Sequence, residues 1–180
     1  MGNKVAIRNN TKVGDFENGD YNFKKLGYGT KIDGGAGTND YGVEGLYVDV
    51  KVTSEEILAL NATPKTIVAA PGAGKLLAFK RALLFLDYNS AAYAGVASGE
   101  DWTFKYTNAS GAVISTIETT GFLDQTADQV RLSYAASAAE ITPVANSPIV
   151  LHQLSGEITT GDSPVYIRVF YDILPSTLSV

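Results

Sequence analysis

Residues that could perform catalysis or bind a metal ion are scarce in this chain. It has no cysteine and a single histidine, His152. The lack of cysteine excludes disulfides, thiolate zinc sites, iron–sulfur clusters and thiol nucleophiles, and a single histidine excludes sites built from several histidines. His152 lies in the apolar stretch 149–154. We therefore expect a hydrogen-bonded structural histidine rather than a metal ligand or the base of a serine triad.

The sequence APGAGK at residues 70–75 is similar to a phosphate-binding loop but lacks two required positions. That loop needs glycine where this chain has Ala69, and serine or threonine where it has Leu76. The pattern therefore predicts a tight turn and no nucleotide site. Carboxylates within residues 15–20 lie on a glycine-rich stretch, but they lack the spacing of a calcium-binding EF-hand loop. A solvated loop is the favoured interpretation there.

Paired carboxylates for acid–base catalysis, as in glycoside cleavage, need two acids close together. Nothing in the spacing of this sequence brings two acids together, and most of the candidates fall at expected strand ends and turns. These candidates are Glu100, Asp101, Glu118, Asp124 and Asp128. Trp102 follows Asp101 and could stack on a sugar ring, but a core or interface role is favoured. The sequence predicts a protein that is not an enzyme and needs no cofactor or metal.

Composition and charge narrow the class of protein further. A length of 180 residues suits one domain, or one domain with an arm. The net charge of −5 argues against nucleic acid as a partner, because that affinity depends on cations at phosphates. No apolar run approaches the ~18 residues that a membrane span needs, so no membrane partner is expected. Residues 1–10 lack the apolar core of a signal peptide, and we expect synthesis in the cytoplasm.

The first part of the chain differs in composition from the rest. Ten of the 18 glycines lie in residues 1–50, together with four tyrosines, and few aliphatic residues precede Leu46. Such a stretch buries too little apolar surface to offset roughly 1–2 kcal/mol of backbone entropy per residue. Two interpretations stay open: an extended arm that orders when its tyrosines dock, or a loop-rich lead-in on its own domain. We assign residues 1–45 to this arm or lead-in and residues 46–180 to one domain.

From Leu46 onward, apolar and polar residues alternate in several segments, which predicts half-buried strands. A Thr53 or Ser54 cap followed by two acids predicts a short helix. The Lys80–Arg81 pair interrupts one apolar run and indicates a bulge or an edge. Strands are expected at 46–52, 65–70, 76–88, 102–106, 113–118, 149–154 and 165–173, helical turns at 124–132, and a loop at 134–139. The fold class is mainly β: an antiparallel β-sandwich, jelly-roll or Ig-like, with one or two short helices and an extended N-terminal arm.

Arginine and tyrosine are the residues most favoured at the centres of protein interfaces. In the last expected strand, Tyr166 and Arg168 share the outward face, and an ordinary solvated face is the alternative interpretation. The basic pair Lys80–Arg81 is also a candidate for an interface, with a solvated face again as the alternative. The candidate interface residues are Tyr21, Tyr28, Tyr41, Tyr47, Lys80, Arg81, Tyr166 and Arg168.

Several segments, taken in order, resemble small virion proteins of tailed bacteriophages and prophages. The resemblance covers about residues 53–174 and leaves residues 1–50 outside it. Its segments are structural turns and strands rather than catalytic signatures. They are 57–64, 67–75, 83–88, 92–94, 106–107, 121–128 and 160–164.

This resemblance implies a virion β-sandwich, and most directly a capsid decoration (cement) protein that bridges neighbouring capsomers. It implies the major capsid protein as partner, assembly as a homotrimer, and a location on the capsid surface after synthesis in the host cytoplasm. The alternative is a tail-fibre or receptor-binding module that recognises host surface glycan through aromatics such as Trp102, Tyr88 or Tyr93. A glycan-cleaving enzyme is the weakest of the three hypotheses.

Overall fold

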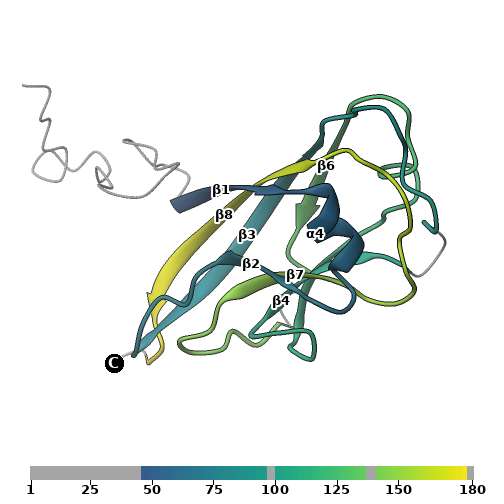
Figure 1. Cartoon of the computed structure of the whole chain (residues 1–180). Coiled ribbons are helices and arrows are strands. Elements are labelled where there is room, and N and C mark those ends of the chain that lie inside the picture. The colour runs from purple at the N-terminus through teal and green to yellow at the C-terminus, as the bar shows by residue number, and fades with distance from the viewer. Residues whose placement is uncertain (1–45, 97–99, 137–140, 178–180) are drawn as a thin grey trace, which may run out of the picture. The chain divides into compact units, whose positions relative to one another are not determined.

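The computed structural model describes residues 46–96, 100–136 and 141–177, which form two antiparallel four-stranded sheets (Figure 1). The strand order of the first sheet is β1-β8-β3-β6, and that of the second sheet is β2-β7-β4-β5. The first sheet comprises β1 (Leu46–Val52), β8 (Val165–Pro175), β3 (Lys75–Leu86) and β6 (Gln129–Tyr134). The second comprises β2 (Lys65–Val68), β7 (Ile149–Gln153), β4 (Trp102–Tyr106) and β5 (Val113–Ile117), and α4 (Ser54–Ala59) connects β1 to β2. The predicted β-sandwich is confirmed.

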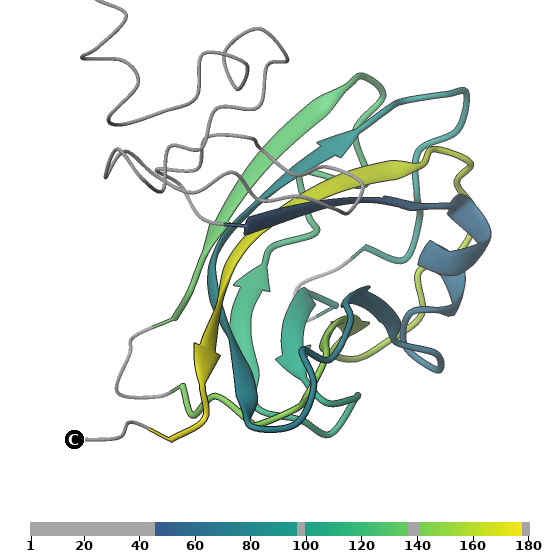
Figure 2. The same ribbon diagram turned by 90° about the vertical axis from the view of Figure 1, so that its left-hand side faces the viewer.

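The core lies between the two sheets, and aromatic side chains of β4 fill its centre. Figure 2 shows the long strands of the first sheet curving over the shorter strands of the second. Trp102, Phe104 and Tyr106 alternate along β4 toward the first sheet and are fully buried. The rings of Phe104 and Phe79 lie 5.2 Å apart, and the Tyr106 hydroxyl donates to the Leu77 carbonyl at 2.7 Å. These contacts link β4 to β3 and so tie the second sheet to the first.

The short helix α4 begins where the sequence predicts it. The Thr53 hydroxyl accepts a hydrogen bond from the Glu56 amide at 3.4 Å, and the Thr53 amide donates to Glu56 Oε2 at 2.9 Å. This reciprocal capping box satisfies two of the amides that a helix start leaves free. Glu56 also pairs with Lys65 at the start of β2. The helix therefore presents Ile57 to the core while it is fixed to the next strand.

A β-bulge in β3 sets which side chains face the core. The pairing of β3 with β8 shifts between Phe79 and Arg81, so Lys80 is the extra residue. Before the bulge Leu77 and Phe79 are buried, whereas after it Ala82 and the alternate residues to Leu86 are buried. One inserted residue thus moves the buried set from odd to even positions. Of the two features predicted at the basic pair, a bulge or an edge, the bulge is confirmed, whereas β3 lies between β8 and β6 and is not an edge strand. The bulge turns Arg81 away from the core.

Residues 124–132 are not helical, which corrects the sequence-based expectation. Turns occupy 120–124, and residues 129–134 form the edge strand β6 paired with β3. Tyr134, expected at the start of a loop, is the last residue of this strand. Apolar and polar residues alternate in 129–134 as in a strand, but the apolar residues face outward instead of toward the core. The predicted turn before β3 is confirmed, with Gly72 and Gly74 at φ of +98° and +71°.

Candidate interaction surface

Twelve side chains on the side of the first sheet opposite the core form a surface that we call the outer face. They come from all four strands and alternate with residues that are buried or packed against the core. The strand register arranges them in three rows across the sheet. The rows are Tyr47, Phe170, Arg81 and Tyr134; then Asp49, Arg168, Leu83 and Leu132; and then Lys51, Tyr166, Phe85 and Val130.

Apolar side chains on the outer face are unusually exposed at its β6 edge. Val130, Leu132 and Tyr134 are 55%, 57% and 62% exposed, and Leu83 and Tyr166 on the adjacent strands are also exposed. In register, Leu132 lies beside Leu83 and Val130 lies beside Phe85, so the apolar groups are contiguous. Contiguous exposed apolar surface of this kind marks sites of interaction.

Arg168 holds a fixed position at the centre of the outer face. Its Nε and Nη2 atoms each donate to a different carboxylate oxygen of Asp49 at 2.7 Å. The guanidinium carbon also lies 4.5 Å from the centre of the Tyr47 ring. The hydrogen bonds to Asp49 raise the pKa of Arg168, the attraction of the Asp49 charge adds to this, and the group is always charged. An exposed ion pair contributes at most about 1 kcal/mol to folding, so its main effect is to orient the guanidinium.

The other two cations of the outer face also lie over aromatic rings. The Arg81 guanidinium is 4.2 Å from the centre of the Phe170 ring, and Lys51 Nζ is 5.5 Å from the centre of the Tyr166 ring. Cation–π contacts at exposed sites are worth about 0.5–1 kcal/mol each. Together with Arg168, these pairs place three cations over aromatic rings on one surface.

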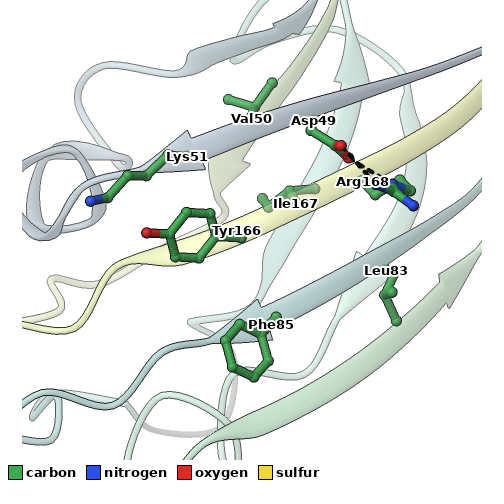
Figure 3. Close-up of a pocket in the computed structure, with 8 residues that line it drawn as sticks. All are labelled: Asp49, Val50, Lys51, Leu83, Phe85, Tyr166, Ile167 and Arg168. Atoms are coloured by element: carbon green, nitrogen blue, oxygen red, sulfur yellow. Dashed lines mark hydrogen bonds and ion pairs between the residues drawn. The ribbon is translucent and has the colours of Figure 1, made fainter. Parts of the chain in front are cut away.

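A groove of about 550 Å³ opens on the outer face where β1, β8 and β3 lie side by side (Figure 3). Leu83, Phe85 and Tyr166 provide most of its apolar lining, while Lys51 and the Asp49–Arg168 pair provide its polar groups. Figure 3 shows Lys51 and Tyr166 next to each other, with Phe85 on the neighbouring strand. The groove therefore combines an apolar lining with a cation at one side.

The charge of the outer face is opposite in sign to that of the rest of the domain. Residues 46–180 contain eight lysines and arginines against thirteen aspartates and glutamates, which accounts for the whole net charge of −5. The outer face has three cations and one carboxylate, leaving five cations against twelve carboxylates elsewhere in that range. A positive face on an acidic domain favours a partner surface that carries carboxylates.

The structure brings together four of the eight predicted interface residues. Tyr47, Arg81, Tyr166 and Arg168 lie on the outer face, whereas Lys80 occupies the bulge with its Nζ 2.9 Å from Asp172 Oδ2. The other three, Tyr21, Tyr28 and Tyr41, lie outside the described residues. The sequence analysis missed Lys51, Leu83, Phe85, Val130, Leu132, Tyr134 and Phe170. Strand alternation in 129–134 was the signal that would have identified three of them.

His152 has the structural role that the sequence predicts. It is buried on β7, and its Nε2 lies 3.2 Å from the Asn61 carbonyl oxygen. Burial lowers the pKa of His152, and the nearby Lys105 ammonium lowers it further. Within the described ranges, no group of three or more histidines, aspartates or glutamates is placed to hold a metal ion.

One pair of acids does meet, contrary to the sequence-based expectation. Trp102 pairs with Ile117, which makes Asp101 and Glu118 neighbours across β4 and β5. Burial raises the pKa of Asp101, and the Glu118 carboxylate raises it further. Trp102 is 0% exposed and contacts Phe122 edge-on, with ring centres 6.3 Å apart. It therefore offers no stacking surface for a sugar beside these acids.

Comparisons with known proteins yield little. No family model matches this chain, and no curated protein matches it. Among solved structures, a chain of the structure described as "Capsid of Ralstonia phage GP4" has 14% identical residues and a TM-score of 0.36. The match covers 75% of this chain and 89% of that chain. A TM-score of this size does not establish a common fold. In addition, none of the helices that the structure describes is long and apolar enough to cross a membrane.

Proposed function

We propose that this chain is a structural protein of a bacteriophage virion, and that it acts as a capsid decoration (cement) protein. In this role it binds the major capsid protein at the capsid surface, bridges neighbouring capsomers and assembles as a homotrimer. The observation that carries the proposal is the outer face, a contiguous apolar and aromatic surface on a sheet that is otherwise part of a closed sandwich. The sequence resemblance to small virion proteins points the same way.

The composition of the outer face is that of a protein contact. Five of its twelve side chains are aromatic and two are arginines, which are the types enriched at the centres of interfaces. Covering the partly exposed Val130, Leu132 and Tyr134 would contribute roughly 1 kcal/mol each from apolar burial. A cement protein needs such a surface and a stable sandwich, but no reaction chemistry. The proposal therefore includes no catalysis and no cofactor.

A glycan-binding role has less support from the surface. Two of the three aromatics suggested for sugar stacking, Trp102 and Tyr93, are buried in the core. The most exposed part of the outer face also carries the aliphatic Leu132 and Val130, which suit protein side chains better than sugar rings. These residues therefore favour a protein partner over a glycan.

A binding experiment with empty, expanded shells of the phage that encodes this chain tests the proposal. The full chain is expected to sediment with the shells and to raise their melting temperature. The double variant Leu132→Ser/Tyr134→Ser is expected to bind at least tenfold more weakly, which corresponds to about 1.4 kcal/mol. Leu58→Ser/Leu154→Ser is the matched control, because these residues are 41% and 42% exposed but lie outside the outer face. Absence of binding by the unaltered chain, or equal weakening by both double variants, would refute the proposal.

A further inference from the structure

The groove on the outer face contains a cation without an acidic partner. Arg168 is neutralised by Asp49, but no carboxylate in the described parts of the chain pairs with Lys51, whose ammonium lies over Tyr166. Phe85 and Leu83 line the groove beside it. A ligand that fits the groove would place a carboxylate at the Lys51 ammonium and an apolar or aromatic side chain against Phe85 and Leu83.

The sequence before β1 supplies this combination three times. In residues 1–45, Phe16 lies between Asp15 and Glu17, Tyr21 follows Asp20, and Tyr41 follows Asp40. Their six lysines and arginines equal their six aspartates and glutamates, so this segment carries no net charge against the acidic domain. We propose that the groove binds one of these aromatic–acidic pairs from residues 1–45 of a second copy of this chain.

The length of the segment and its point of attachment favour a second copy. Forty-five residues span up to about 150 Å when extended, against a radius of gyration of roughly 14 Å for a domain of 135 residues. The segment joins β1 at Leu46, next to Tyr47, whereas Lys51 lies at the other end of that strand. A chain would have to reverse direction to fill its own groove, but a neighbour's segment has no such constraint. This inference rests on the self-association included in the proposed function and assigns a contact to it. Its test needs no capsid, so its failure can be told apart from a failure of capsid binding.

Self-association of the full chain, measured by sedimentation velocity and native mass spectrometry, tests the proposal. The unaltered chain is expected to associate with rising concentration, and Lys51→Glu is expected to weaken this at least tenfold. Lys75→Glu is the matched control, since it makes the same charge change at an exposed lysine of β3 outside the groove. Circular dichroism establishes that each variant remains folded. A chain that stays monomeric at all concentrations, or equal weakening by both substitutions, would overturn the proposal.

Charge exchange identifies the acidic partner of Lys51. The variant in which Asp15, Glu17, Asp20 and Asp40 are all replaced by lysine is expected to associate as weakly as Lys51→Glu. Mixing these two variants is expected to restore association through complementary sites. A synthetic peptide of residues 14–24 added to the full chain is expected to compete with self-association, whereas the same peptide with Asp15→Asn, Glu17→Gln and Asp20→Asn competes less. Association that is indifferent to the mixing and to both peptides would contradict the assignment of residues 1–45 as the occupant.

Discussion

The hydroxyl of Tyr106 is a specific test of how the two sheets are held together. It is buried between the sheets and donates to the Leu77 carbonyl at 2.7 Å, and burial raises the pKa of Tyr106. The substitution Tyr106→Phe keeps the ring and removes only this hydroxyl. A hydrogen bond of this kind contributes about 1 kcal/mol net, and up to about 2 kcal/mol if the carbonyl is left without a donor. The expected loss in the free energy of unfolding is therefore about 1–2 kcal/mol.

Urea denaturation with linear extrapolation measures this loss, and thermal unfolding should show a fall in Tm of roughly 3–6 °C. Tyr134→Phe is the control, because Tyr134 is 62% exposed on the outer face. Its free energy of unfolding should stay within about 0.5 kcal/mol of the unaltered chain. Tyr106→Ala, which also leaves a cavity, should cost about 3–5 kcal/mol. A Tyr106→Phe variant as stable as Tyr134→Phe would refute the reasoning that this bond ties the sheets.

Three further outcomes follow from other parts of the domain. Burial lowers the pKa of His152 below its value of about 6.5 in the unfolded chain, so the unfolded chain binds the proton more tightly. The free energy of unfolding should therefore fall as the pH drops below 6.5. His152→Gln should reduce this fall in denaturation curves measured over a pH series. Hydrogen bonds from the Ser90 hydroxyl and nearby amides lower the pKa of Asp162 to about 2. Asp162→Asn should therefore destabilise the chain at pH 7 and do so much less below pH 2, where this carboxyl is protonated in both the folded and the unfolded state. Gly161→Ala should lower Tm more than Gly72→Ala. Both glycines have positive φ, but only at Gly161 would the new Cβ collide with the Tyr93 ring. Equal losses of Tm in the two variants would contradict the role of this collision.

Local patterns predicted several elements because their cause is local. The alternation that predicts the Leu46–Val52 strand places Val52 in the core and Asp49 and Lys51 outside. The capping box at Thr53 involves only residues three positions apart, and it begins α4 as expected. The basic pair at Lys80 indicated a bulge or an edge, and the structure has the bulge, because regular alternation would turn one of two consecutive cations toward the core.

Alternation in β6 indicates a strand but could not predict which side faces the core, because its inward side chains are polar. Ser133 hydrogen-bonds to Ser115 of β5, and Arg131 donates to the Gly121 carbonyl while its guanidinium lies over the Phe122 ring. These partners are distant in sequence or come from a turn, so only the folded chain supplies them. A buried serine and a half-buried arginine are tolerated once such bonds exist, and the apolar residues of β6 are then left on the outside.

The sequence by itself determined that this chain has no cysteine and only one histidine, and how its strands alternate, because both depend on residue type and on contacts between near neighbours. Tertiary structure alone decided which side chains meet on one surface. Asp49 and Arg168 are 119 positions apart, yet they form the central ion pair of the outer face. The residue inserted at Lys80 re-phases β3 so that Arg81, Leu83 and Phe85 join that face. Register across a sheet is fixed by the packing of its buried side, and the exposed side follows from it.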